Sequence, residues 1–581
     1  MKLDPFVRVA NAGDLSGAGP FALSAGGVDI AVVRRGTGWR VFEGHCPHQG
    51  ALLGEGEIEG DRLVCRNHRW RFSLDSGRRD GGPECLASCP AIERDGAIFV
   101  DVSALKGAPR RTAPTRSLDE LPGPRALPLI GNLHQIDATK AHLVMQGWAE
   151  KYGPIYQIRM GPRRVVVTSD PRLINDALRA RPEIFRRSAN MDAIISEIGI
   201  KGVFNAEGDA WRPQRKLSVA ALAQRHLRQL YPCIRTVAGR LKERWRRSAE
   251  TGAPLDMVDE LKRFTVDVTM LVAFGHDVNT VEQAGDVIQH ELEIILPVVN
   301  RRLFAPFPVW RFVQLPSDRR LDRALKSVRA WLGGLVDDGR ARLKAEPDRA
   351  HRPANFLEAM IAAVDEEGQP FADDVIMSNL LTMLLAGEDT TAYTLAWAVH
   401  QLCDSPEWAT EIRREADEVQ GSTPVAEDID IANRLVRANA VANETMRLRP
   451  VAPVGLLDAN VDTALGDFVI PKGTTVAVLL RPGAIDPERF IEPHAFRPER
   501  WIEDGLQPHD VAAHIPFGSG PRMCPGRSLA LLEMKTLLSM LYKGFDVARV
   551  GHAGDVTERL GFTMSPSGLK VRLQPRSGVV S

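Results

Sequence analysis

Apolar and polar positions follow two different periods along the chain. In the first hundred residues apolar and polar residues alternate in short segments, which glycine-rich turns separate. The alternating segments are 29–34, 39–43, 61–65 and 97–102. This pattern is typical of a small all-β unit. Beyond residue 170 the apolar positions recur with helical periodicity, which predicts a mostly α fold, and two alternating runs within 152–168 add a minor β region.

The stretch 103–120 separates these two parts. It is rich in Ala, Pro, Arg, Ser and Thr and shows neither period, which is typical of a linker. A chain of this length spans roughly 25 Å, so it could carry one domain to the other or act as a passive tether. The sequence therefore predicts a multidomain protein, with a small all-β domain at 1–102, a linker at 103–120 and a mostly α domain at 121–581.

Composition and charge narrow the function classes. Lys plus Arg and Asp plus Glu number 74 each, which argues against nucleic acid as a partner because such proteins carry excess positive charge. The sequence contains no run of about 20 apolar residues that could span a membrane, and its start does not resemble a signal peptide. We therefore expect a cytoplasmic protein without a membrane anchor. Seven scattered cysteines favour cofactor ligation over a disulfide framework.

Two Cys-His pairs lie in turns of the β-rich part. Cys46 and His48 form the first pair, Cys65 and His68 form the second, and sixteen residues separate them. Two thiolates and two imidazoles are what a two-iron cluster needs when cysteines bind one iron and histidines the other. A zinc site with these ligands and a Cys46–Cys65 disulfide are the alternatives. The stretch 46–72 resembles a Rieske ferredoxin, which implies a [2Fe-2S] Rieske cluster on these four residues.

A second candidate metal ligand lies near the C-terminus. Cys524 follows a glycine-rich turn and a cation, and a predicted helix begins directly after it. All three features favour a thiolate that holds a metal, so Cys524 is the candidate axial ligand of a haem iron. A buried structural cysteine is the alternative. The loop resembles that of the haem-thiolate monooxygenases, the cytochrome P-450 superfamily, at Phe517, Gly520, Arg522, Cys524 and Gly526.

This second resemblance extends from about residue 121 to 574 and implies how a haem would be held. Trp211 and Arg215 are four positions apart and share one helix face. In the resembled family such a pair hydrogen-bonds a haem propionate, whereas in isolation it would indicate packing. The segment 453–462 lacks the basic residue that often serves a propionate. Arg215 and Arg522 are therefore expected to carry more of that charge.

The longest apolar helix predicted, 373–403, contains the hexapeptide Ala-Gly-Glu-Asp-Thr-Thr at 386–391. Glycine and β-branched threonine destabilise a helix interior. The presence of such unfavourable residues in a long helix indicates that they have a function. In the resembled family the glycine lets the helix pass close over the haem, and the acid-alcohol pair relays protons to bound dioxygen. Asp389 and Thr390 are therefore the expected catalytic residues. A threonine that only bonds the preceding turn is the alternative.

Glu444 and Arg447 share a helix face three positions apart. The resemblance implies that Arg500 joins them in a buried charge network behind the haem. The role of this network is structural rather than chemical. An isolated solvated ion pair of small energetic effect is the alternative.

Together the resemblances imply a monooxygenase with haem b, a Rieske cluster and O₂ as co-substrate. Electrons from NAD(P)H would arrive through a separate ferredoxin reductase, because the chain has no dinucleotide-binding fingerprint. The alternatives are a peroxygenase or isomerase that needs no external electrons, and a non-catalytic redox sensor or electron carrier. The apolar stretches 191–200 and 294–313 lie where the family builds its substrate roof, which favours a lipophilic substrate, although apolar stripes more often form core.

Overall fold

In the computed structural model the chain forms two units, which are described separately. Contacts divide the chain between residues 114 and 115, inside the stretch that the sequence predicts as a linker. The structure describes residues 6–576 with short gaps at 16, 26–27, 37, 48–51, 66–69, 83, 102–114, 284–286, 306, 365–367, 503–505 and 507–508. For 224–225, 287–290 and 292–293 only the backbone is described.

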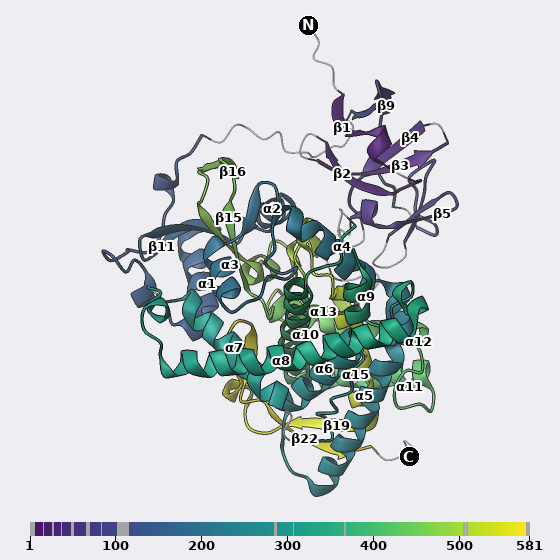
Figure 1. Ribbon diagram of the computed structural model, residues 1–581, viewed down its shortest axis with the longest axis vertical. Helices are drawn as coiled ribbons and strands as arrows, with labels where there is room; N and C mark the ends of the chain where they lie inside the picture. Colours follow the sequence, from purple (N-terminus) through teal and green to yellow (C-terminus); the bar gives the residue numbers. More distant parts are fainter. Residues whose placement is uncertain are drawn as a thin grey trace. The chain divides into compact units, whose positions relative to one another are not determined.

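The first unit is built from antiparallel strands (Figure 1). The strand orders of its sheets are β2-β3-β4-β8, β5-β6-β7 and β1-β10-β9. The strands are β1 (Val7–Asn11), β2 (Phe21–Ala25), β3 (Val28–Arg35), β4 (Gly38–Glu43), β5 (Glu57–Glu59), β6 (Arg62–Val64), β7 (Arg71–Ser73), β8 (Ser88–Cys89), β9 (Ala91–Arg94) and β10 (Ala97–Val100). Strand β3 is buried on both faces, because Ala31 and Val33 pack into one apolar cluster and Ile30 and Val32 into another.

The second unit is mostly helical (Figure 1). Its helices are α1 (Ala141–Tyr152), α2 (Pro171–Arg179), α3 (Ala189–Glu197), α4 (Trp211–Ala221), α5 (Gln224–Thr251), α6 (Met257–Phe274), α7 (Val287–Leu303), α8 (Pro316–Ala345), α9 (Phe356–Ala362), α10 (Asp373–Leu402), α11 (Pro406–Gln420), α12 (Ile429–Asn433), α13 (Val436–Leu448), α14 (Leu480–Ala484) and α15 (Arg527–Gly544). Local sequence sets their ends: at α6 the Asp256 carboxylate accepts the N–H groups of Val258 and Asp259, and Gly275 at φ 65° closes the last turn.

A five-stranded sheet joins distant parts of this unit, in the order β11 (Ile155–Met160), β12 (Arg163–Thr168), β18 (Thr475–Leu479), β15 (Val454–Ala459) and β13 (Phe185–Arg187). Antiparallel pairing places Arg187 of β13 opposite Leu457 of β15. The remaining strands are β14 (Leu255–Asp256), β16 (Thr463–Leu465), β17 (Phe468–Ile470), β19 (Phe545–Arg549), β20 (Thr557–Leu560), β21 (Met564–Ser567) and β22 (Lys570–Pro575). The predicted fold class, a small all-β domain followed by a mostly α domain with a minor β region, is confirmed.

Helix α10 runs through the core of the second unit and packs against α6. At Gly387 an added Cβ would lie 2.5 Å from Thr269 Oγ1. Close passage of Gly387 over a haem stays a prediction, and the contact that the structure shows at this glycine is with Thr269 of α6. Among the described residues, every helix is too short or too polar to cross a lipid bilayer.

Candidate functional site

A tight loop between η12 (Gly520–Arg522) and the start of α15 holds Cys524. The Cys524 N–H donates to the Phe517 carbonyl (2.9 Å), and the Met523 N–H donates to the Gly520 carbonyl (3.0 Å). Gly520 has a φ of 71°, and a Cβ there would lie 2.6 Å from the Arg179 Cα. Glycine is therefore needed for the loop to lie against α2.

The Cys524 thiol is accessible to solvent, although protein atoms crowd around it. Its surface is exposed, yet burial among the surrounding atoms raises its pKa. The N–H groups of Gly526 and Arg527 and the charge of Arg215 lower the pKa, but burial outweighs them. A metal in place of the proton would favour the thiolate form of Cys524.

Helix α10 also has an accessible patch in the middle of a buried surface. Ala386 is exposed and Thr390 is partly exposed, whereas Leu384 and Leu385 beside them are buried. An exposed alanine on a core helix indicates a hollow next to it. Thr390 Oγ1 donates to the Ala386 carbonyl (2.8 Å), which is the bond to the preceding turn that the sequence left as an alternative. The hydroxyl oxygen keeps lone pairs that can accept a hydrogen bond from a proton donor.

Asp389 is buried between α6 and the turn that joins β20 to β21. Neither element belongs to the sequence motif that contains Asp389. Lys262 Nζ of α6 lies 3.4 Å from Asp389 Oδ1 and 3.1 Å from Glu388 Oε1. Thr563, in the turn between β20 and β21, donates its hydroxyl to Asp389 Oδ2 (3.4 Å). The carboxylate is thus oriented from both sides of α10. Sequence reasoning missed Lys262 and Thr563, because only the fold brings them to α10.

The structure brings together four residues that the sequence predicts for the site: Trp211, Arg215, Arg522 and Cys524. The Arg522 guanidinium lies over the Trp211 ring, 4.1 Å from its centroid. Arg215, one turn further along α4, is near enough to lower the pKa values of both Arg522 and Cys524. Arg215 and Arg527 place positive charge near the Cys524 thiol.

Two further arginines, Arg181 and Arg187, lie close to Arg522, although the sequence motifs do not include them. Burial lowers the pKa of Arg187 to about 9, with Arg181 and Arg522 adding to the effect. Burial likewise lowers the pKa of Arg522 to about 10. The nearest counter-charge is Glu207, which accepts from Arg522 Nη2 (2.5 Å) and from the Arg187 N–H (3.0 Å).

The arginine cluster, defined as Arg181, Arg187, Arg215 and Arg522, has the character of an anion site. Nε and Nη2 of Arg181 and Nε and Nη1 of Arg522 are buried and form no hydrogen bond with any residue that the structure describes. Buried guanidinium groups without acceptors are unfavourable, so an anion with several acceptor oxygens fits here. Arg187 of β13 also pairs across the sheet with Leu457 of β15. Leu457 lies in the segment 453–462, which lacks the basic residue expected there. These residues fit the carboxylates of the haem that the resemblance implies.

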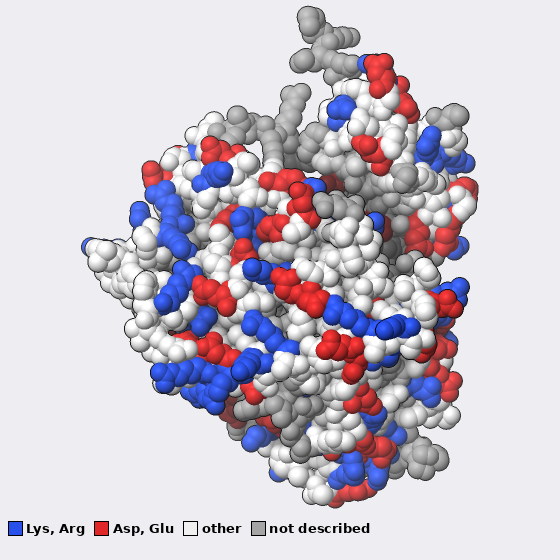
Figure 2. Space-filling model, in the orientation of Figure 1, with Lys and Arg blue, Asp and Glu red and all other residues white. Residues whose placement is uncertain are grey.

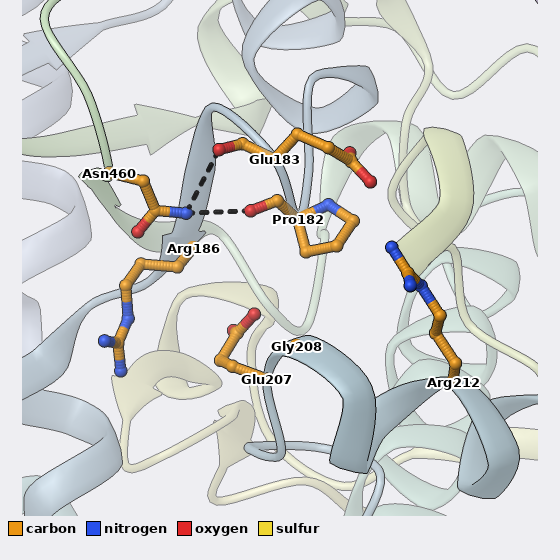
Figure 3. A pocket seen from close by; sticks show the side chains of 7 residues that line it. All are labelled: Pro182, Glu183, Arg186, Glu207, Gly208, Arg212 and Asn460. Carbon is orange, nitrogen blue, oxygen red and sulfur yellow. Dashed lines mark hydrogen bonds between the residues drawn. The ribbon is translucent and has the colours of Figure 1, made fainter.

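An open hollow of about 230 Å³ includes Glu207, the acid that pairs with Arg522, in its wall (Figure 3). It is lined by Pro182, Glu183, Arg186, Glu207, Gly208, Arg212 and Asn460. Asn460 Nδ2 donates to the carbonyls of Pro182 (2.8 Å) and Glu183 (3.4 Å) and so fixes one wall. Two acids balance two arginines in this hollow, so it does not account for the unpartnered guanidinium groups.

Glu444, Arg447 and Arg500 are fully buried and in direct contact. Arg447 donates to both Glu444 oxygens (2.8 Å each) and Arg500 Nε donates to Oε1 (3.1 Å). Trp501 Nε1 adds a fourth donor bond to Glu444 Oε2 (2.9 Å). Sequence reasoning missed this tryptophan, although it directly follows Arg500. Arg447 also donates to the Ala484 carbonyl (2.7 Å), so the network ties α13 to α14.

The first unit holds its two candidate cysteine ligands in one place. Cys46 and Cys65 are buried in the same apolar cluster, with Leu53, Leu63 and Phe72. Both are described, and neither forms a disulfide, so the alternative of a Cys46–Cys65 bond is wrong. His48 and His68 lie outside the described residues.

Residues 121–573 match the cytochrome P450 family. The chain belongs to that family. Residues 5–91 match the Rieske [2Fe-2S] domain, so this P450 carries a Rieske domain at its N-terminal side, and both predicted resemblances are confirmed. A P450 implies haem and a Rieske domain implies a [2Fe-2S] cluster.

Curated relatives of this P450 have varied names, and some of these names include the word monooxygenase. Protein LUTEIN DEFICIENT 5, chloroplastic, of Arabidopsis thaliana is 26% identical over 442 residues, 73% of either chain. Protopine 6-monooxygenase of Eschscholzia californica is 26% identical over 489 residues, 80% of this chain and 90% of the relative. Self-sufficient cytochrome P450 monooxygenase CYP505E4 of Penicillium expansum is 25% identical over 471 residues, 80% of this chain but only 44% of the relative. The protein is therefore a P450 monooxygenase with a Rieske domain, and these names do not agree on a substrate.

Proposed function

We propose that this P450 inserts one oxygen atom of O₂ into a lipophilic organic substrate with electrons that its own Rieske domain delivers. The observation that carries the proposal is the presence of both redox domains in one chain. The stretch 103–120 that joins them is long enough, at roughly 25 Å, for delivery within the chain. NAD(P)H would reduce the Rieske domain through a separate ferredoxin reductase.

Each part of the P450 site has a distinct task in this proposal. When bound, haem would supply oxygen activation and the Rieske cluster would supply single electrons. Cys524 binds the haem iron as a thiolate, and the arginine cluster with Trp211 binds the haem carboxylates. Phe517, Gly520 and Gly526 shape the loop that presents the thiol. Glu444, Arg447 and Arg500 hold α13 and its neighbours in place.

Asp389 and Thr390 move protons in this proposal. The Thr390 hydroxyl lies on the accessible patch of α10, where a water or an oxygen substrate could bond it. The neighbouring Asp389 carboxylate is buried and held by Lys262, so it can exchange a proton without a large movement of backbone.

In the Rieske domain, Cys46 and Cys65 bind one iron of the cluster, and His48 and His68 bind the other. The position of both cysteines in one buried cluster supports the cysteine half of this assignment. The lipophilic substrate is proposed from the family position of 191–200 and 294–313. Several of these side chains pack into core, among them Ile194, Ile195 and Val299.

The proposal is tested with the full chain loaded with haem and cluster. Candidate lipids and terpenes are screened by the spectral shift that displacement of the iron-bound water causes, and those that bind are incubated with O₂, NADH and a ferredoxin reductase. Product that requires the reductase supports the proposal. Equal turnover with peroxide alone would indicate a peroxygenase, and binding without turnover under either condition would indicate a sensor. The matched control is Cys46→Ser, which should bind substrate but give no reductase-driven product.

A further inference from the structure

The segment that joins β6 to β7 contains the second Cys-His pair, and we call residues 65–70 the second ligand segment. The Cys65 N–H donates to the Trp70 carbonyl (2.8 Å), so the backbone joins the two ends of this segment. The Trp70 ring packs against the apolar cluster that contains Cys46 and Cys65. Arg79 lies over the same ring, with its guanidinium 3.8 Å from the ring centroid. Arg79 therefore covers the residue at which the second ligand segment ends.

Arg79 is itself held by an ion pair with Glu84. Arg79 Nε and Glu84 Oε2 lie 3.1 Å apart, and both atoms are buried. The Arg79 N–H also donates to the Glu84 carbonyl (2.8 Å), so backbone and side chains join the same two residues. Gly82 makes room for this pair, because a Cβ there would clash with both Arg79 Nε and Glu84 Oε2. We call Trp70, Arg79 and Glu84 the clamp.

The charges of the clamp bear on redox chemistry as well as on folding. Reduction adds an electron to an iron–sulfur cluster, so a nearby cation favours the reduced form and a nearby anion favours the oxidised form. Such effects are stronger where the charged atoms are shielded from water, as Arg79 Nε and Glu84 Oε2 are. Exposed charges have less influence, since acidic and basic side chains are interspersed over the visible face of the first unit (Figure 2) and solvent screens them.

We propose that Arg79 is a positioning residue for the Rieske cluster, which holds the second ligand segment through Trp70 and raises the reduction potential of the cluster through its charge. Glu84 orients Arg79 and opposes that charge. The inference rests on the proposed function, which assigns the cluster to the two Cys-His pairs. It goes beyond that assignment, because Arg79 and Glu84 belong to neither pair. Opposite charges in one clamp hold the segment while their net effect on the potential stays small.

The test uses the full chain loaded with haem and cluster, and follows the electron paramagnetic signal of the reduced cluster during a titration with chemical redox mediators. Arg79→Met should lower the reduction potential, because it removes the cation and leaves the Glu84 charge. Glu84→Gln should raise the potential, because it leaves the cation without its counter-charge. Each variant should change the ratio of reduced to oxidised cluster at a fixed potential by about threefold or more, which is about 28 mV for one electron. The double variant should return close to the wild-type potential.

The holding role is measured separately, as the rate at which a chelator removes iron from the cluster. Arg79→Met should lose iron about fivefold to tenfold faster than the wild type, because it removes a partly buried cation from the Trp70 ring. Arg79→Lys keeps a cation over this ring and should restore most of the potential and of the iron retention. The matched control is Arg78→Met, which removes the same charge from the neighbouring, exposed position and should change neither quantity.

The signs of the two potential shifts decide the outcome. Shifts of the same sign in Arg79→Met and Glu84→Gln, or no shift in either, would overturn the proposal. An equal shift in Arg78→Met would also overturn it, because the effect would then follow the net charge of the domain. If thermal unfolding shows that Arg79→Met does not fold, Glu84→Gln decides alone, and an unchanged or lowered potential would overturn the proposal. None of these measurements depends on turnover, so failure of the proposed function would be seen separately, as an intact cluster without reductase-driven product.

Discussion

Replacing Arg187 with methionine should have opposite effects on the haem-free and haem-bound protein. Arg187 is partly buried within the arginine cluster, where Glu207 is the nearest counter-charge. Burial lowers the pKa of Arg187 to about 9, far below its ordinary value, which at about 1.36 kcal/mol per pKa unit corresponds to an unfavourable free energy on the order of a few kcal/mol. Arg187 Nε also donates to the Phe204 carbonyl (2.9 Å), and its guanidinium lies 3.6 Å from the Phe204 ring centroid. Losing these contacts offsets part of the gain.

We therefore expect haem-free Arg187→Met to be more stable than the haem-free wild type by about 1–3 kcal/mol at pH 7, measured by urea unfolding. The pKa of Arg187 is lowered to about 9 in the folded protein and keeps its higher, ordinary value in the unfolded chain. Between these values the unfolded state binds more protons, so the free energy of unfolding of the wild type rises with pH. The difference in the free energy of unfolding between haem-free Arg187→Met and the haem-free wild type should narrow as pH rises from 8 to 10.5.

With haem bound the order should reverse. A charged hydrogen bond contributes about 1.5–3 kcal/mol, so transfer of haem from Arg187→Met to an apoglobin scavenger should be about tenfold to a hundredfold faster than from the wild type. The matched control is Arg186→Met, because Arg186 is the neighbouring residue of β13 but pairs with Asp192 (3.2 Å). That control should change haem transfer little. A variant that is destabilised in both forms with unchanged haem transfer would refute the reasoning.

Three further perturbations test other parts of the site. Glu444→Gln leaves Arg447 and Arg500 buried without their charge partner and should cost about 3–5 kcal/mol in the free energy of unfolding; an unchanged urea midpoint would contradict a buried network. Thr390→Ala should uncouple NADH oxidation from product, and full coupling, measured as product per NADH, would argue against the proton relay. Cys46→Ser should remove the electron paramagnetic signal of the reduced cluster while haem absorption stays, and a signal of undiminished intensity would exclude Cys46 as a ligand.

Local motifs explain which parts of the site could be predicted from the sequence. Cys524, the Glu444–Arg447 pair and the Asp389–Thr390 pair each lie within a few residues of their motif neighbours, so the resemblance of these short motifs to the family was sufficient to predict their roles. The alternating and helical periods likewise predicted the two fold classes, because burial on one face imposes those periods directly.

The other residues of the site are brought together by contacts between segments that are far apart in the sequence. The spacing of residues within a motif does not indicate such contacts. Arg187 joins the arginine cluster because β13 pairs with β15, about 270 residues away along the chain. Thr563 reaches Asp389 from the C-terminal hairpin. The missing cation in 453–462 was a hint that another segment supplies one, but the sequence did not show which. Gly387 shows the opposite case, since its position was identified while its contact, Thr269 of α6, was not.

The central claim is that electrons pass from the Rieske domain to the P450 domain of the same chain. The direct measurement is rapid mixing of the loaded protein with reduced ferredoxin reductase under carbon monoxide, with absorbance followed at the cluster band and at the haem–CO band. After the cluster is reduced, its reoxidation and the growth of the haem–CO band should share one first-order rate constant that does not change over a tenfold range of protein concentration. A rate constant that rises in proportion to concentration, or a haem–CO band that forms equally fast in Cys46→Ser, would contradict delivery within the chain.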